Sequence, residues 1–447
     1  MSTGPSSGSM SRHVLLSVAG NAFPPLAALI IAPILARTLG VDDRGVVAAA
    51  QGPFVLLVTI AGFGIPEAVT YASARFPSTQ RVVFRRGLGW VSVAGVVGSL
   101  LALLASDWLS DGSSATQALI VLSLLGVVPT LWLGVLRARA SALHAWSVVA
   151  QERASSAVLR AGAIAALAAT GELNTLSATV VLTFGPILGA VAYLRLPAPM
   201  ADPEASSDTF GTRSMFAYGS RVWLGAVSGI LLIRLDQAVM APLAGTRELG
   251  YYVVAVAIGE VPLIVNSAIR DVTFTAESVG GAASSTTRLT AAARVSGSIT
   301  AAIAVVLALV TPFLVPLVFG LEFSDAIPAT LVLLASVAIS TPGSVAGAGL
   351  AGRGRPGLRS ASLATACVVN VIALVLLAPI LGALGAALAT FVGNLVSANL
   401  NILAMSRTSD ARATGFYGLR RTDVDLLRQV IRRVRGRRRP PAGSEVN

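Results

Sequence analysis

The sequence predicts an all-α polytopic membrane protein with about twelve transmembrane helices. Three observations lead to this fold class: 54% of the residues are hydrophobic, only 12% are charged, and long apolar segments follow one another along nearly the whole chain. A bilayer core is about 30 Å thick, so a helix that crosses it needs roughly 20 mostly apolar residues. The polar stretches that remain are too short for a soluble catalytic domain, so we do not expect an enzyme.

The predicted spans follow the runs of apolar residues along the chain. They comprise residues 14–36, 46–73, 88–105, 117–136, 156–170, 174–194, 216–243, 250–269, 295–319, 327–350, 360–379 and 382–404. The first span is longer than the apolar core of a signal peptide, so we expect it to be retained. The fifth is the shortest and contains an arginine, Arg160.

Arginines occupy gaps of even rank between the spans, and this pattern predicts the orientation. Arginines follow the second, fourth and tenth spans and continue through the tail after the twelfth. Gaps of odd rank are neutral or acidic, as with Glu172 after the fifth span and Glu322 after the ninth. Loops rich in positive charge stay on the cytoplasmic side. Both termini are therefore expected in the cytoplasm.

A short motif occurs twice and indicates an internal repeat. Residues 40–45 separate the first two spans and residues 245–250 separate the seventh and eighth, each as Gly-x4-Gly. Glycine allows a tight helical hairpin. Because six spans separate the copies, the halves run in the same direction, which is typical of two pseudo-symmetric transporter lobes. The expected division is a cytoplasmic N-terminus (1–13), an N-terminal six-helix lobe (14–194), a cytoplasmic linker (195–215), a C-terminal six-helix lobe (216–405) and a basic cytoplasmic tail (406–447).

Residue usage excludes several kinds of site. All 33 basic residues are arginine, so the chain lacks the lysine of a P-loop and of a Schiff base. Cys367 is the only cysteine, which excludes disulfides within the chain and Cys-rich zinc sites. The net charge of +12 fits inside-positive loops and a basic tail better than nucleic-acid binding. We expect no metal centre and no cofactor other than a coupling ion, H⁺ or Na⁺.

Charges inside the spans are the strongest candidates for functional residues, because a charge at mid-bilayer costs about 2.5–3.5 kcal/mol. Arg234 and Asp236 lie in the seventh span and Glu260 in the eighth. At 1.5 Å per residue, Arg234 and Glu260 both lie about 14 Å below the outer surface, so they can form an ion pair. The pair could simply hold the hairpin together. Alternatively, it lines a central cavity where the arginine meets an anionic substrate and the carboxylate carries a proton.

Other polar residues complete the set of candidates. Asp236 faces away from Arg234 and needs a partner of its own. Asn21 and Asn266 are further cavity candidates, and Glu67 joins Asp236 and Glu260 as a candidate for ion coupling. For Asn21, Asn266 and Glu67, solvation at the membrane edge is the alternative interpretation. The same alternative applies to Arg37, Arg44, Arg221, Arg270 and Asp271.

The tail carries a pattern of its own. Within residues 422–434, apolar side chains repeat at helical spacing and arginines fill the other face. This pattern predicts a basic amphipathic helix on the anionic inner leaflet. A disordered tail that only sets the topology is the alternative.

Five motifs, taken in their order and spacing, resemble those of one family. They are residues 34–40 (ILARTLG), the apolar run ending at 62–64 (GFG), 234–237 (RLDQ), 249–255 (LGYYVVA) and 319–326 (FGLEFSDA). The family is that of the polysaccharide biosynthesis flippases, Wzx-like translocases of the MOP exporter superfamily. The resemblance runs from about Ser11 to Met405.

The resemblance implies a twelve-helix, MATE-like exporter of the bacterial cytoplasmic membrane. Such an exporter would flip an undecaprenyl-pyrophosphate-linked oligosaccharide to the outer leaflet by alternating access, and Arg234 would match an arginine that recurs in the family. The implied partners are the lipid-linked oligosaccharide, membrane lipids and polysaccharide assembly proteins, with no nucleic acid. Lipid II flippases, with fourteen helices, fit less well.

Two other functions stay open. A multidrug/cation antiporter of the same superfamily would need a carboxylate-rich cavity. A membrane glycosyltransferase or polymerase would usually carry a larger outer loop than this chain has.

Overall fold

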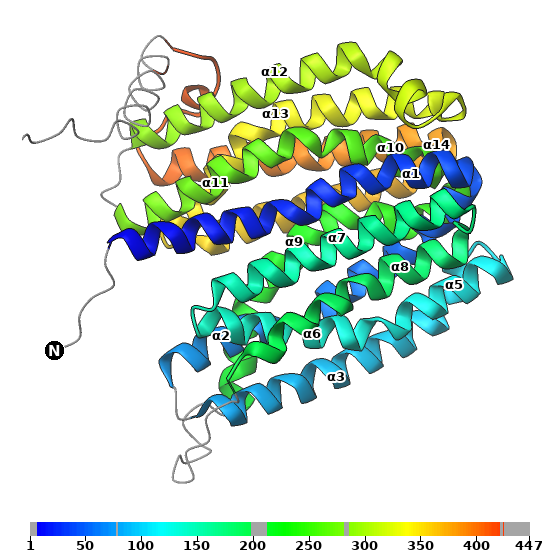
Figure 1. Cartoon of the computed structure of the whole chain (residues 1–447). Helices are drawn as coiled ribbons and strands as arrows, with labels where there is room; N and C mark the ends of the chain where they lie inside the picture. Colours follow the sequence, from blue (N-terminus) through cyan, green and yellow to red (C-terminus); the bar gives the residue numbers. More distant parts are fainter. Residues whose placement is uncertain (1–6, 77–78, 198–211, 281–285, 421–422, 424–447) are drawn as a thin grey trace, which may run out of the picture.

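The computed structural model consists of α-helices that lie side by side (Figure 1). It describes residues 7–76, 79–197, 212–280, 286–420 and 423, and these contain helices, turns and no strand. The predicted all-α fold class is confirmed. In chain order the helices are α1 (Ser7–Ala61), α2 (Ile65–Arg75), α3 (Gln80–Leu104), α4 (Ser106–Leu109), α5 (Ser114–Leu125), α6 (Val127–Ala142), α7 (Trp146–Thr170), α8 (Thr175–Leu188), η2 (Gly189–Arg195), α9 (Thr212–Ala244), α10 (Thr246–Gly259), α11 (Val261–Gly280), α12 (Thr286–Val318), η4 (Leu321–Ala326), α13 (Ile327–Gly352), α14 (Pro356–Thr408) and η5 (Ala413–Phe416).

Eight helical segments of the described chain are long and apolar enough to cross a membrane, or nine if the bent pair α10–α11 counts as one. Two of them, Phe23–Arg75 and Pro356–Thr408, are 53 residues long. At 1.5 Å per residue each would extend to about 80 Å, more than twice the bilayer core. Each is interrupted by a glycine with positive φ, Gly40 at 74° and Gly382 at 56°. Counted as two passes each, and with the less apolar α7 included, the helices follow the order of the twelve predicted spans.

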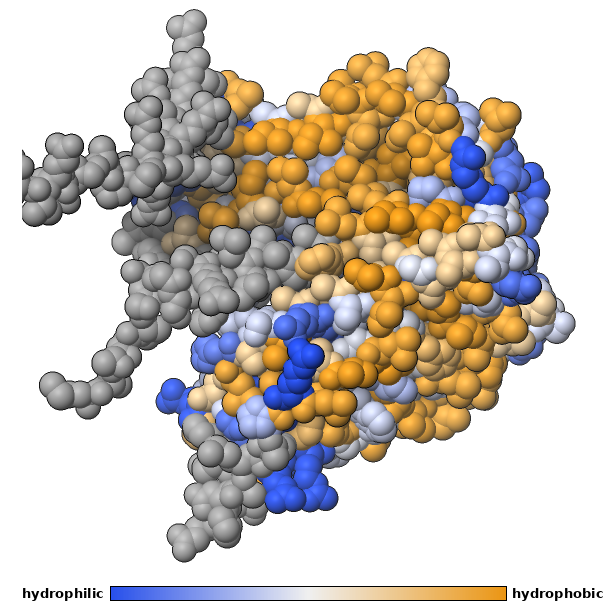
Figure 2. All heavy atoms as spheres, viewed as in Figure 1, coloured by the Kyte–Doolittle hydropathy of each residue, from blue (hydrophilic) through white to orange (hydrophobic). Residues whose placement is uncertain are grey.

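The surface matches a protein that lies in lipid. Hydrophobic residues cover the middle of the helices, and hydrophilic residues gather toward their ends (Figure 2). Val305 and Val306, near the middle of α12, are 57% and 59% exposed. An apolar surface of this extent would favour aggregation in water, but acyl chains cover it in a membrane. The chain is therefore a multi-pass membrane protein.

Several elements begin or end away from the predicted positions. Helix α1 starts at Ser7 and α14 continues to Thr408, so both enter the segments predicted as terminus and tail. Helix α7 starts at Trp146, ten residues before the predicted fifth span. The first turns of α7 contain charged residues. They are stabilised by the ion pair of the buried Glu152 with Arg137, whose N–O distance is 3.0 Å.

Two predicted spans are also interrupted within the membrane region. The second span breaks between α1 and α2, where Phe63 and Gly64 have positive φ, and the eighth breaks at Glu260. A proline follows each break, Pro66 in α2 and Pro262 in α11. Proline lacks the amide hydrogen that continues a helix, and its ring clashes with the preceding turn. Helices α10 and α11 are bent by 47° at this point.

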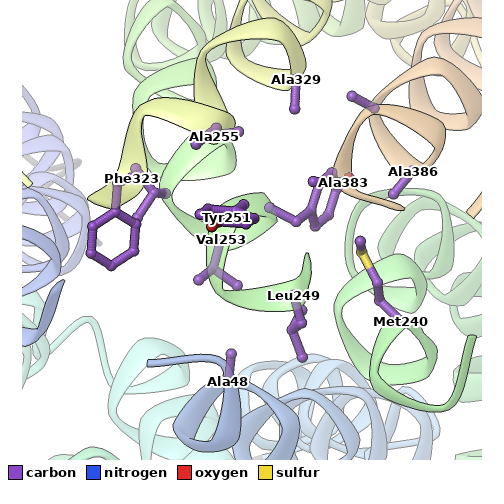
Figure 3. Packing of buried hydrophobic residues seen from close by; sticks show 14 of the residues in the cluster. Ala48, Met240, Leu249, Tyr251, Val253, Ala255, Phe323, Ala329, Ala383 and Ala386 are labelled. Atoms are coloured by element: carbon purple, nitrogen blue, oxygen red, sulfur yellow. The ribbon is translucent and has the colours of Figure 1, made fainter. Parts of the chain in front are cut away.

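The largest buried apolar cluster joins the two halves of the chain. It centres on α10 and includes residues of α1, α9, α13 and α14. Figure 3 shows Tyr251 and Val253 of α10 between Ala48 of α1 and Ala383 of α14. The contributions from α1 and α14 are mostly alanines, so the helix backbones approach closely, as is common in membrane proteins.

The two Gly-x4-Gly motifs lie against each other at one end of this cluster. A Cβ added at Gly45 would collide with the backbone carbonyl of Thr246, and one added at Gly250 would collide with that of Val41. Val41 and Thr246 are the residues after the first glycine of each motif. The contact is therefore reciprocal, as a pseudo-two-fold axis between the halves requires. We call this contact the glycine seal.

An ion pair extends the glycine seal. Arg247 donates to Asp42 across 3.1 Å, and each occupies the next position of its motif. Nearby, the carboxylate of Glu248 accepts a hydrogen bond of 2.8 Å from the backbone of Ala383, beside the Gly382 turn. Three of the turns expected on the outer side therefore meet at one end of the molecule.

The first part of the tail is packed against the opposite end of α12. Arg294 donates to both carboxylate oxygens of Asp423, at 2.7 and 2.6 Å, and to the carbonyl oxygen of Gly415 at 2.7 Å. Phe416 is fully buried in a cluster with Leu289 of α12 and Met405 of α14. Apart from Asp423, the predicted amphipathic helix lies outside the described residues. Residues 409–420 and Asp423 thus hold the start of the basic tail at a fixed place.

We predict that Gly45→Val separates the halves at the glycine seal, because the new side chain cannot fit beside Thr246. In a cysteine-free background (Cys367→Ser), a single Ala257→Cys reports on the space behind the seal. Labelling of this thiol by an impermeant reagent, added on the side of the seal, should increase at least several-fold. Gly162→Val is the control, because nothing lies within 4 Å of a Cβ at that position. Equal labelling in both variants would contradict the role of the seal.

We predict that Asp423→Asn releases the docked tail segment, because loss of one partner from a buried ion pair costs about 3–5 kcal/mol. Trypsin should then cleave at Arg412 and Arg420 much faster. Asp410→Asn, at an exposed position of the same segment, should change nothing.

The docked tail also carries a pH dependence. Hydrogen bonds from Arg294 hold the pKa of the Asp423 carboxyl below its usual value. Because the folded pKa is lowered, its stabilisation is complete above the ordinary value of about 3.9 and is lost as the pH falls through the folded pKa. Protection from acid-stable proteases should therefore persist at pH 5. Loss of protection already at pH 6 would contradict this assignment.

Candidate functional site

Arg234 and Glu260 form the ion pair that their depths predicted. Nη2 of Arg234 lies 2.9 Å from Oε1 of Glu260, and the side chains are 31% and 39% exposed. Arg234 projects from α9, whereas Glu260 lies at the bend between α10 and α11. The pair is thus not sealed within the protein. It forms part of the wall of a cavity.

This cavity, which we call the inter-lobe cavity, lies between α1, α7 and α8 on one side and α9, α10 and α11 on the other. Its volume is about 470 Å³. The charged residues among its lining are Arg44, Arg160, Arg234 and Glu260. Since Glu260 neutralises one arginine, two positive charges are left over.

Three nitrogen atoms around the inter-lobe cavity have no hydrogen-bond partner among the described residues. They are Nε of Arg44, Nε of Arg160 and Nε2 of Gln237, and all three are buried. Buried donors are nearly always paired in proteins, and each unpaired one costs roughly 1–3 kcal/mol. The site therefore offers donors, but few acceptors, to whatever occupies the cavity.

A second cavity lies within the C-terminal half, between α9, α10, α11, α13 and α14. This C-lobe cavity has a volume of about 300 Å³. It adjoins the inter-lobe cavity, because five lining residues belong to both: Ile233, Val256, Glu260, Leu263 and Ser267. Glu260 thus stands at the boundary between the two spaces.

Asp236 lines the C-lobe cavity. As its position on the helix predicted, its hydrogen-bond partners are residues other than Arg234. It is 2% exposed, and its carboxylate accepts hydrogen bonds from the hydroxyl of Tyr252, from Thr390 at 3.1 Å and from the backbone of Gln237 at 2.7 Å. Asn266 lines the same cavity, where it accepts from Ser296 at 3.3 Å and donates to Ser344 at 3.5 Å.

The remaining candidates are more scattered. Glu67 is exposed on α2 beside Thr70 and Tyr71, and it lines neither of these two cavities. Asn21 falls within α1, but its side chain lies outside the described residues, as does that of Arg221. Arg270 lines the C-lobe cavity, whereas Arg37 donates to the carbonyl oxygen of Val318 at 2.9 Å, near the glycine seal.

Sequence reasoning undervalued Arg44 and Arg160 and missed Gln237. In the sequence, Arg160 marks only the weakness of the short fifth span, and Arg44 is only one of two arginines that flank the first outer turn. An arginine inside a span is itself a signal, since it needs a partner or a wet cavity. The direction in which it points depends on the rotation of its helix, which hydropathy does not define.

Comparisons with known proteins agree with this architecture. The sequence pattern of a family described as polysaccharide biosynthesis protein matches residues 11–274. Among curated proteins, none matches the sequence.

Solved structures share the fold at low sequence identity. The lipid II flippase MurJ in an inward closed conformation is 14% identical, with a TM-score of 0.73 over 88% of this chain and 87% of that one. A MOP superfamily transporter from Pyrococcus furiosus is 15% identical, with a TM-score of 0.61 over 89% and 94%. A MATE transporter in a straight conformation is 17% identical, with a TM-score of 0.61 over 90% and 96%.

Proposed function

The chain belongs to the polysaccharide biosynthesis protein family, and from this membership we propose that it flips undecaprenyl-pyrophosphate-linked oligosaccharides across the bacterial cytoplasmic membrane. Family and fold together indicate a transporter of the MOP superfamily rather than an enzyme. The substrate would cross by alternating access between the lobes, with its lipid tail in the bilayer. Its oligosaccharide would then serve surface polysaccharide synthesis on the outer side.

The observation that carries this proposal is the charge of the inter-lobe cavity. Three arginines face one glutamate there, and two of the arginines have unpaired Nε donors. A pyrophosphate is anionic and presents only acceptor oxygens, which guanidinium groups bind in a planar, bidentate manner. A multidrug/cation antiporter would instead need carboxylates, and Glu260 is the one carboxylate among the described lining residues.

Ion coupling is the second part of the proposal. Arginine keeps its proton at physiological pH, so only Glu260 can change its charge among the described lining residues of the inter-lobe cavity. Asp236 is the corresponding group of the C-lobe cavity and is enclosed by Tyr252 and Thr390. We propose that H⁺ or Na⁺ acts at these two carboxylates. Glu67 is a weaker candidate, since it lies apart from both.

We predict that Arg160→Gln and Arg44→Gln each lower flipping of a lipid-linked oligosaccharide by about 10- to 100-fold, because a hydrogen bond to a charged group contributes roughly 1.5–3 kcal/mol. The measurement is leaflet exposure of a fluorescent substrate in proteoliposomes. Arg81→Gln is the control, because Arg81 is exposed on α3 and lines neither cavity. If both cavity variants keep full flipping and the wild type transports cationic dyes instead, the antiporter is the correct function.

We predict that exchange of the ion pair, Arg234→Glu together with Glu260→Arg, abolishes flipping although the pair can re-form. The arginine would then project from the bend of span eight, away from its place on α9. The two single variants and a thermal unfolding midpoint show whether the exchanged protein is folded. Flipping restored by the exchange, after loss in both single variants, would assign the pair a structural role only.

Deletion of the gene tests the proposal in the cell. Lipid-linked intermediate should accumulate in the cytoplasmic leaflet while surface polysaccharide is lost. Absence of any lipid-linked intermediate would favour a glycosyltransferase or polymerase.

A further inference from the structure

We propose that the C-lobe cavity binds the sugar that is attached to the pyrophosphate of the substrate, while the inter-lobe cavity binds the pyrophosphate itself. This inference rests on the proposed function. It divides the site into two compartments with different chemistry, and it places sugar recognition within the C-terminal half.

The first support is the chemistry of the C-lobe cavity. Amides and hydroxyls dominate its polar lining, whereas the inter-lobe cavity relies on arginines. These residues are Asn266, Asn394, Asn401, Ser267, Ser336, Ser340, Ser344, Ser397 and Thr390, with Tyr252 beside Asp236. An arginine only donates hydrogen bonds, but amides and hydroxyls both donate and accept. A sugar hydroxyl needs a partner of each kind, and only this cavity provides both in number.

The second support is charge. The charged residues of the C-lobe cavity are two carboxylates and two arginines, Asp236, Glu260, Arg270 and Arg359. Glu260 is already paired with Arg234, so the C-lobe cavity keeps one uncompensated positive charge, against two in the inter-lobe cavity. The adjoining compartment is therefore better suited to an anion, and the C-lobe cavity to a polar group of lower charge.

The third support is an unsatisfied acceptor. Asn401 is 3% exposed and lines the C-lobe cavity, yet its Oδ1 has no hydrogen-bond partner among the described residues. Asn394 lies two helical turns before Asn401 on α14, and it donates to Ser336 at 3.0 Å. A buried amide oxygen without a partner is costly unless a ligand or water donates to it. Asn401 thus offers an acceptor to a hydroxyl group.

The fourth support is continuity. The cavities share Glu260 and four neighbouring residues, so one ligand can extend from one into the other. In a glycosyl pyrophosphate the first sugar is bonded directly to a phosphate, so adjoining compartments are what such a ligand requires. A volume of about 300 Å³ lies at the lower end for ligand pockets. The cavity therefore accommodates the first sugar and leaves the rest of the oligosaccharide outside.

Binding of two probes to purified protein tests this division. The probes are a short prenyl pyrophosphate and the same molecule carrying one N-acetylhexosamine. The wild type should bind the glycosylated probe at least tenfold more tightly. Asn394→Leu combined with Asn401→Leu should remove this difference and leave the affinity for the bare pyrophosphate unchanged. Arg160→Gln, the matched control, should weaken both probes equally.

Thiol protection provides a second test with smaller changes. In the Cys367→Ser background, a Ser340→Cys thiol in the C-lobe cavity should be protected from alkylation by the glycosylated probe only. An Ala257→Cys thiol, which lines the inter-lobe cavity only, should be protected by both probes. If the variant with Asn394→Leu and Asn401→Leu does not fold, the binding test is repeated with Ser336→Ala combined with Ser397→Ala.

The outcomes separate this inference from the proposed function. Tight binding of both probes, with no preference for the sugar or with protection of Ser340→Cys by the bare pyrophosphate, overturns the sugar compartment and leaves the flippase intact. Failure of the wild type to bind either probe overturns both.

Discussion

Close approach of the two glycine turns is the constraint on which the rest of the structure depends. Gly45 and Gly250 carry no Cβ, so the backbones of α1 and α10 can touch. This contact sets the relative depth of the two hairpins. It follows that Arg44, which precedes Gly45, and the Arg234–Glu260 pair face the same space between the lobes. A larger residue in either turn would push the two turns apart and displace the walls of the cavity.

The charged residues of the inter-lobe cavity are tolerated in the membrane because they face the cavity and not the lipid. Isolated charges at mid-bilayer are costly, and this protein groups Arg44, Arg160 and Arg234 around one internal space where water or an anion can reach them. Glu260 limits the repulsion among them by pairing with Arg234. The same carboxylate also lines the more neutral C-lobe cavity, so it lies at the boundary between two environments of different charge.

Hydropathy and helix geometry predicted most of the fold and the central ion pair. Apolar length predicts a span, and equal distances from the Gly245–Gly250 turn predict that Arg234 meets Glu260. The partners of Asp236 could not be foreseen in this way. Thr390 lies 154 residues further along the chain, and its contact with Asp236 depends on how α9 and α14 pack. Likewise, the orientation of Arg160 depends on the rotation of α7, to which a hydropathy pattern is insensitive.

The composition of the glycine seal also bears on the balance between conformational states. Glycines and alanines bury little apolar area, and burial contributes only about 25 cal/mol per Å². The side chains of Asp42 and Arg247 are 65% and 60% exposed, so water and salt screen this pair and it contributes little. The contacts of the two glycine turns by themselves therefore add little to the free-energy gap between a closed and an open state. Ligand binding can offset a contribution of that size through a modest difference in affinity for the two states.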